Sequence, residues 1–472
     1  MGGTSRRQFL TAGLLGAGSV SLGLLAYARH QAAGGQANIP ELMGPLGVVE
    51  DETTGLPLLR LPEGFRYKSM SWAGSRLHDG HTVPGAADGM GVVRQEGSRV
   101  TLVRNHELQG SSGAFGAQET AYDITPGGTT TLVFDTAREE LVDSRVSLNG
   151  TLYNCAGGVT PWGSWLSCEE SVFNPQMAQL APPRKQTFWD AAGARKAHGF
   201  VFEVPATGVA KPVPILEMGQ FYHEAVVIDP ATGMAYMTED IGPKAGFYRF
   251  IPNIAGNLHA GGQLQMMKVL GRPDMTDYLQ PLQEMDVEWV DIPDPTAGLV
   301  KSHPNGNGVV SQGLAAGGSA FVALEGCAIS EGRVYFTSKL GGSAMAGYIY
   351  EYHPAREKIW LVYESPGHAQ FSGPDNVVVS PRGSLVICED RLTQQKAAQN
   401  VAGLTRNGEF FRFCQINPSL KGSHGGHNLA RTALDSEWAG ATFSADGEWM
   451  FINIYNPGIT LAITGPWQEG FI

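Results

Sequence analysis

One repeated pattern restricts the folds open to this chain. An apolar strand, a tight turn with Gly, Pro or Asp, and a second apolar strand follow one another in "AVVIDPATGMAYMTED" at 225–240. Such a unit is the sequence signal of a β-hairpin. Several copies are followed by a third alternating strand, as in "HGFVFEV" and "GYIYEY", and helical periodicity is scarce. Related copies stand at 91–107, 154–170, 327–339, 376–390 and 441–455.

Six hairpin units predict an all-β fold, a six-bladed β-propeller with long inter-strand loops. A double-sheet sandwich is the alternative, but a sandwich does not explain why one repeat recurs in register. We expect a single propeller domain over residues 38–472, which is long enough for a large closed architecture. Within it, residues 38–75 should bridge the N-terminus to the propeller. Residues 255–322 should form a long connection between two blades.

The N-terminus has the pattern of an export signal. Arg6 and Arg7 precede an apolar, Gly- and Ala-rich stretch that runs to about Ala28, which is typical of a signal peptide and too short for a membrane span. The paired arginines resemble a twin-arginine (Tat) signal, with an ordinary Sec signal as the alternative. We therefore expect residues 1–37 to be a signal peptide and spacer. The mature protein would be periplasmic or secreted, with the Tat translocase as its partner during export and no stable membrane span afterwards.

The net charge indicates which ligands the chain could bind, and the number of cysteines indicates whether they form disulfides. The net charge of −12 makes a cation a plausible ligand and nucleic acid an unlikely one. Five cysteines cannot all pair within one chain. A protein folded in the reducing cytoplasm before export keeps free thiols, which are usually buried or metal-bound. We expect buried apolar thiols at Cys168, Cys327, Cys388 and Cys414.

The strand ends carry the residues that predict a site. In a propeller blade the start of the first strand and the end of the second emerge on the same face, because the two strands are antiparallel. Each acidic pair alone is more often a solvated strand end, but recurrence in register on one face predicts a ring of ligands at the channel mouth. When the copies are aligned on the turn, the starts carry Cys155, Glu224, Glu325 and Asp375, with Gly89 and Ala439 in the other two and Asp88 one residue earlier. The ends carry Glu169-Glu170, Glu239-Asp240, Glu389-Asp390 and Asn105-His106-Glu107, with Ser338-Lys339 and Asn453 in the other two.

Such a ring predicts metal binding. Clustered carboxylates must be neutralised by protons or cations. Hard oxygen ligands suit Ca²⁺ or Mg²⁺, and one thiolate, Cys155, suits iron or zinc beside them. His106 and His223 stand next to glutamates of the ring, as ligands or as groups that orient ligands. The sequence has no GxSxG elbow and no Walker loop, which argues against serine hydrolases and NTPases. A Cys–His nucleophile at Cys155 is an alternative without a clear partner.

Several segments resemble the motifs of PhoX-type alkaline phosphatases, which are Tat-exported bacterial proteins. The segments are "VRNHE", "NCAGGVTPWGSWLSCEE", "HEAVVIDPATGMAYMTED", "LEG" and "FSGPDNVVVSPRGSLVICED", and the likeness covers nearly the whole mature chain. The resemblance implies a six-bladed propeller with two oxygen-bridged iron ions (Fe³⁺) and Ca²⁺ ions in the channel mouth. It implies metal ligands at Cys155, Glu170, Glu224 and Glu325, with Glu239, Asp375, Glu169 and Glu107 as additional calcium ligands or supporting groups. For the phosphate, Lys339 is the first candidate, followed by Arg391 and Arg104.

The expected function is therefore hydrolysis of small-molecule phosphate monoesters by an alkaline phosphatase-like enzyme that does not bind nucleic acid. Two alternatives stay open. One is another calcium-dependent propeller hydrolase, such as a lactonase or a phytase. The other is a non-enzymatic propeller that keeps calcium for structure and presents its loops to a partner.

Overall fold

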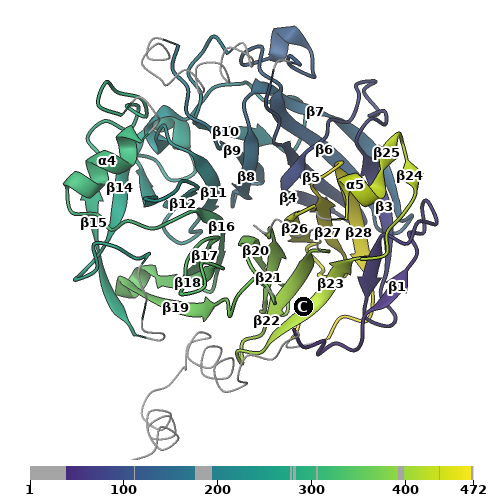
Figure 1. Cartoon of the computed structure of the whole chain (residues 1–472). Helices are drawn as coiled ribbons and strands as arrows, with labels where there is room; N and C mark the ends of the chain where they lie inside the picture. Colours follow the sequence, from purple (N-terminus) through teal and green to yellow (C-terminus); the bar gives the residue numbers. More distant parts are fainter. Residues whose placement is uncertain are drawn as a thin grey trace, which may run out of the picture.

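The fold is all-β and propeller-like, with its sheets arranged around a central axis (Figure 1). The computed structural model describes residues 39–472 except 111, 176–193, 277–278, 280–282, 304–306, 369, 392–397, 435 and 469–470. The expected leader, 1–37, lies outside the described residues. Helices in the described part are short: α4 (Gly308–Ala315), α5 (Leu429–Thr432) and the 3₁₀ turns Gln118–Thr120, Leu216–Met218, Leu258–Ala260 and Pro354–Arg356. None of these described helices is both long and apolar enough to cross a membrane.

The sheets are antiparallel and mostly follow the order of the chain. The first two sheets are β4 (Ala87–Glu96), β5 (Arg99–His106), β6 (Gly127–Asp135) and β7 (Glu140–Thr151), then β8 (Asn154–Val159), β9 (Ser164–Glu169) and β10 (Val201–Pro205). A nine-stranded sheet follows, in which β15 joins two four-stranded units at their outer edges. Its strands are β11 (His223–Ile228), β12 (Ala235–Glu239), β13 (Phe247–Pro252), β14 (Gly262–Val269), β15 (Met285–Asp291), β16 (Leu324–Ser330), β17 (Arg333–Ser338), β18 (Tyr348–His353) and β19 (Lys358–Glu364).

The last two large sheets recruit strands from the start of the described chain. One joins β20 (Pro374–Val379), β21 (Leu385–Glu389), β22 (Asn400–Leu404) and β23 (Phe410–Ile416) to β2 (Leu59–Leu61) and β1 (Gly47–Val49). The other joins β26 (Trp438–Phe443), β27 (Met450–Ile454) and β28 (Ile459–Thr464) to β3 (Arg66–Trp72). A small hairpin, β24 (Ser423–His424) with β25 (His427–Asn428), lies between them in sequence.

Two expectations about connections were wrong. Residues 38–75 do not merely bridge to the propeller, because β2 and β3 pair with the outer edges of sheets formed by the C-terminal third, and β1 pairs with β2. Residues 255–322 contain β14, β15 and α4. The outer edge of a sheet presents unpaired N–H and C=O groups, and a short strand from elsewhere in the chain satisfies them. This long-range pairing leaves no repeat in the sequence.

The inner strands close a ring. Each of β4, β8, β11, β16 and β20 contacts the next inner strand, and β26 contacts both β20 and β4 (Figure 1). The inner hairpins are therefore arranged around one axis as the repeats predicted. Because the nine-stranded sheet merges two units through β15, the number of blades stays a prediction.

Aromatic side chains fill the space between the two four-stranded units of the nine-stranded sheet. Phe247 on β13 stacks on Phe336 of β17 with ring centroids 4.1 Å apart, and Phe336 stacks in turn on Tyr350 at 5.0 Å. All three are buried, and each buried aromatic removes about 150–250 Å² from water. The five cysteines are all free and buried, which confirms the expectation of unpaired thiols.

Truncating one of these rings should weaken the fold measurably. Replacing Phe247 with Ala removes its stacking on Phe336 and leaves a cavity, so the free energy of unfolding should fall by about 3–5 kcal/mol. Denaturant-induced unfolding followed by tryptophan fluorescence measures this. Val48→Ala is the control, because that side chain is 57% exposed; an equal effect of both substitutions would contradict the packing described here.

Candidate metal centre

Both ends of each inner hairpin meet at one end of the channel. The residue directly after the second strand donates its backbone N–H to a carbonyl just before the first strand: Glu170 to Tyr153 at 2.9 Å, and Lys339 to Ala323 at 2.9 Å. The same bond recurs with Glu107, Asp240, Asp390 and Tyr455 as donors. These bonds hold the side chains of the two strand ends beside one another in all six inner hairpins.

A β-bulge near the start of the first strand of each inner hairpin sets the direction of the side chains there. The pairing register shifts between Asn154 and Gly157 in one hairpin and between His223 and Val226 in the next. Equivalent shifts lie at Ala87/Met90, Leu324/Cys327, Pro374/Val377 and Ala439/Thr442. A β-bulge inserts an unpaired residue and re-aims its side chain. Cys155 and Glu224 lie within two of these bulges.

The residues thus placed line a cavity of about 210 Å³. Its walls are almost entirely polar or charged. The lining comprises Asp88, Glu107, Tyr153, Cys155, Glu170, Asp240, Glu325, Lys339, Asp375, Asp390, Glu437, Ala439 and Tyr455. Six residues selected from the sequence are among them: Cys155, Glu170, Glu325, Asp375, Glu107 and Lys339.

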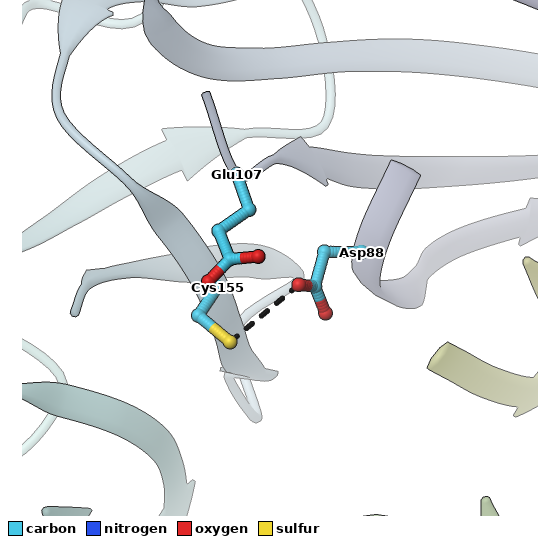
Figure 2. Close-up of side chains that lie close together, drawn as sticks. All are labelled: Asp88, Glu107 and Cys155. Carbon is cyan, nitrogen blue, oxygen red and sulfur yellow. Dashed lines mark hydrogen bonds between the residues drawn. The ribbon is translucent and has the colours of Figure 1, made fainter. Parts of the chain in front are cut away.

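The possible ligands form four overlapping groups, each with its ligand atoms within 4.8 Å of one another. In Figure 2, Asp88, Glu107 and Cys155 point toward a common space, and the Cys155 Sγ donates to Asp88 Oδ2 at 3.5 Å. The other groups are Cys155–Glu170–Glu224, Glu224–Glu325–Asp375 and Asp375–Asp390–Glu437. Each group shares a member with the next, so the ligands form one continuous arc around the channel mouth.

The electrostatics of the arc disfavour its charged forms. Burial raises the pKa of Glu224 well above its usual value, and the charge of Asp375 raises it further. Burial and then Glu107 do the same for Glu170 and for Asp88. Burial raises the pKa of Asp240 to about 6. These carboxylates cannot all be ionised together without a compensating cation.

Glu224 tests whether a metal fits. Both of its carboxylate oxygens are buried, and neither has a hydrogen-bond partner. The Oε1 of Glu325 is also buried without a hydrogen bond, although the ammonium of Lys339 lies 3.5 Å from it. A buried carboxylate without partners is costly, whereas a metal ion satisfies such oxygens directly. The donors present, one thiol among many carboxylates, therefore fit bound metal cations.

The first members of the acidic pairs point elsewhere. Glu169 accepts a hydrogen bond from the Gly199 backbone N–H at 2.8 Å and lies 2.7 Å from Nδ1 of His198. Glu239 accepts from the Tyr248 hydroxyl at 2.7 Å. Successive strand residues face opposite sides, so the structure does not bring Glu169 and Glu239 into the arc. They instead anchor the segments that follow their strands.

Of the three basic residues predicted to bind phosphate, only one lines the cavity. Arg391 donates from Nε and a terminal nitrogen to Glu389 Oε1 at 3.0 and 2.7 Å and does not line the cavity. Arg104 is fully buried and bonds to the Thr130 hydroxyl, also outside the cavity. Lys339 does line it, with its Nζ 3.3 Å from an oxygen of Asp375.

The two histidines are not members of the metal-ligand groups. His106 Nδ1 lies 2.8 Å from the Gly85 carbonyl, and His223 Nε2 lies 2.9 Å from the Gly219 carbonyl. Burial lowers the pKa of both rings, so they are neutral at ordinary pH. Their hydrogen bonds to backbone carbonyls hold the chain in place beside the ligand groups.

The sequence matches the model of the alkaline phosphatase PhoX family over residues 43–145 and 117–458. The chain belongs to the PhoX alkaline phosphatase family. No curated protein matches it. The resemblance that the motifs indicated is thereby confirmed, and the match spans the inner hairpins that carry the arc.

Solved structures resemble this PhoX-family chain only distantly. One is the PQQ domain of pyranose dehydrogenase from Coprinopsis cinerea, with 9% identity, TM-score 0.33, and coverage of 88% of this chain and 100% of that one. Another is the calcium-binding protein regucalcin from Agrobacterium tumefaciens, with 9% identity, TM-score 0.34, and coverage of 85% and 97%. A putative 6-phosphogluconolactonase from Bacteroides uniformis has 10% identity, TM-score 0.32, and coverage of 71% and 84%. Likenesses at this level carry no argument about function.

Four acidic residues of this PhoX-family cavity were not selected as ligands from the sequence: Asp88, Asp240, Asp390 and Glu437. The sequence held a signal for Asp240 and Asp390, which follow their strands as Glu170 does. Glu437 precedes its strand, where the repeat carries no acidic signal.

The sequence alignment placed Asp88 one residue before the ligand position for a structural reason. Strand β4 has a second register shift, between Val92 and Arg94. Because of this extra residue, counting residues back from the hairpin turn gives a position that is wrong by one. Pairing places Ala87 opposite His106 just as Asn154 lies opposite its partner in β9, so Asp88 is the counterpart of Cys155.

The raised pKa values predict an unusual pH dependence of the metal-free protein. Protonated carboxyls are favoured in the folded state, so stability is present at low pH and is lost as pH rises through the raised values. For Asp240 alone, a rise from 3.8 to about 6 corresponds to about 3 kcal/mol, which is lost as pH rises from about 4 to 6. The melting temperature of chelator-treated protein should therefore fall over this range, and should fall further as Glu224 and Glu170, whose pKa values are raised more strongly, ionise. Restoring metal should flatten the profile, and identical profiles with and without metal would contradict the assignment.

Proposed function

We propose that this chain is a metal-dependent phosphomonoesterase, a PhoX-type alkaline phosphatase that hydrolyses small-molecule phosphate esters. Membership of the family supports the reaction class. The observation that carries the proposal is Glu224, whose buried oxygens have no hydrogen-bond partner and whose ligand group includes the thiol of Cys155. A cavity beside this group is large enough to admit a phosphate group.

The metal-donor atoms differ in softness, and this would decide which metal each group holds. Cys155 with Glu170 and Glu224 would hold iron, because thiolate is the softest donor of the arc. The oxygen-only group Glu224–Glu325–Asp375 would hold calcium, which prefers carboxylates. When bound, these ions supply Lewis acidity, which offsets the charge of a phosphate ester and activates water.

The protein's own side chains prepare the site. Backbone bonds and bulges fix the ligands before any substrate arrives, which lowers the cost of organising charge during reaction. Tyr153 and Tyr455 line the cavity, and burial keeps the pKa of both phenols above the ordinary value. Both phenols therefore keep their protons: the Tyr455 hydroxyl donates to the Glu107 carbonyl at 3.5 Å, and the Tyr153 hydroxyl would donate to an oxygen of a bound ester.

The wider proposal concerns architecture and location. If β15 is treated as a link between two four-stranded units, the inner hairpins correspond to six blades of a single catalytic domain over 38–472. Arg6 and Arg7 support export through the Tat pathway, with the mature enzyme periplasmic or secreted.

Removing a proposed iron ligand should abolish both metal and activity. Cys155→Ala and Glu224→Gln should each lose bound iron, and kcat/KM for p-nitrophenyl phosphate should fall about 100-fold or more, since even groups behind the ligands typically contribute 10- to 100-fold. Elemental analysis of protein purified without chelator, together with the hydrolysis rate, measures both.

Cys168→Ala is the matched control. This thiol is also buried but lies outside the cavity lining and the ligand groups, so metal content and rate should stay at the wild-type values. Retention of wild-type metal and rate in Cys155→Ala and Glu224→Gln would contradict the proposal. Hydrolysis of lactones in place of phosphate esters, or calcium without iron in an inactive protein, would favour the alternatives.

A further inference from the structure

Lys339 reverses the charge at one position of the ring. The residue directly after the second inner strand is acidic in four hairpins: Glu107, Glu170, Asp240 and Asp390. In the hairpin of β16 and β17 it is Lys339. Its backbone N–H donates to the Ala323 carbonyl at 2.9 Å. Each of the four acidic residues likewise donates to the carbonyl just before the first strand of its own hairpin. Its side chain therefore enters the same cavity in the place of a ligand.

Carboxylates surround the ammonium group. Its Nζ lies 3.3 Å from Asp375 Oδ2 and 3.5 Å from Glu325 Oε1, and it also pairs with Asp390 Oδ2. An ammonium has three N–H donors, and three carboxylates stand around this one. A phosphate would have to displace one of them to bind Lys339.

These carboxylates belong to two metal-ligand groups. Asp375 and Asp390 belong with Glu437 to one group whose ligand atoms lie within 4.8 Å of one another, and Glu325 and Asp375 belong with Glu224 to the next. The ammonium thus pairs with two of the three members of each group, but only the second group contains Glu224, whose two oxygens have no hydrogen-bond partner. Three carboxylates within reach of the ammonium favour its charged form. Among the described cavity-lining residues, no other side chain is basic.

We propose that Lys339 is a built-in counter-ion that takes the place of one divalent metal ion. It neutralises the Asp375–Asp390–Glu437 side of the cavity, which stays free of metal in this chain. A divalent ion next to the ammonium would be repelled, and two of the three carboxylates it needs, Asp375 and Asp390, already pair with the ammonium. The inference rests on the proposed metal binding by the arc, but not on phosphatase activity. It gives Lys339 a neutralising role in place of the phosphate-binding role predicted from the sequence.

Metal stoichiometry tests this directly. The full chain, purified in calcium, is dialysed to equilibrium at a fixed free Ca²⁺ concentration, and calcium per chain is measured. Lys339→Ala removes the charge and leaves room for an ion, so it should bind one more calcium per chain than wild type. Lys339→Arg keeps the charge and should keep the wild-type count. Lys268→Ala is the control, since that lysine pairs with Glu288 on an exposed strand.

An unchanged calcium count in Lys339→Ala would overturn the inference. If inhibition by inorganic phosphate also weakened about tenfold in that variant, Lys339 would be a phosphate ligand. A second arm does not depend on Lys339→Ala folding: Asp390→Asn should leave the metal count of the otherwise wild-type chain unchanged, because Lys339 already neutralises that carboxylate. Loss of an ion in Asp390→Asn would equally overturn the inference. A wild-type chain that binds no divalent metal would instead refute the proposed function.

Discussion

Carboxylates that face one another inside the cavity impose the main constraint on this structure. Two like charges 4 Å apart repel by about 4 kcal/mol at an effective dielectric constant of 20, and the arc contains many such neighbours. Side-chain bonds between adjacent hairpins oppose that repulsion. Asn105 donates to the Cys155 carbonyl at 2.9 Å, and Asn453 donates to the Asp88 carbonyl at 2.6 Å. Each bond ties a bulge of one hairpin to the neighbouring hairpin.

The acidic pairs show how one sequence unit serves two structural roles. The first carboxylate of the pair, such as Glu169, accepts hydrogen bonds from the segment that follows its strand. The following residue, Glu170, turns into the cavity. Loops and ligands are thus fixed by neighbouring residues of the same strand end, so the ligand geometry depends on the whole sheet and not on a flexible loop. Bound cations, with Lys339 among the carboxylates, then complete the charge balance.

Much of the fold and part of the site followed from the sequence. Alternating apolar residues around turns identified the inner hairpins, because each hairpin is a local structure whose pattern has a period of two. The ligand types were visible for the same reason, since they recur at fixed distances from the turn. The outer strands β2 and β3 were not predicted, because their partners β23 and β28 lie hundreds of residues away, and β1 joins the sheet only through β2. Asp88 was misplaced because a second bulge in β4 changed the count.

By itself, the sequence determined the ring of hairpins and the chemistry gathered at one end of it: a thiol, many carboxylates and one lysine. The tertiary structure decided which member of each acidic pair enters the cavity, because the direction of a side chain depends on strand register and on the bulge. It also decided that Glu437 joins the arc and that Lys339 lies among three carboxylates. These relations exist only between neighbouring hairpins, and no single repeat contains them.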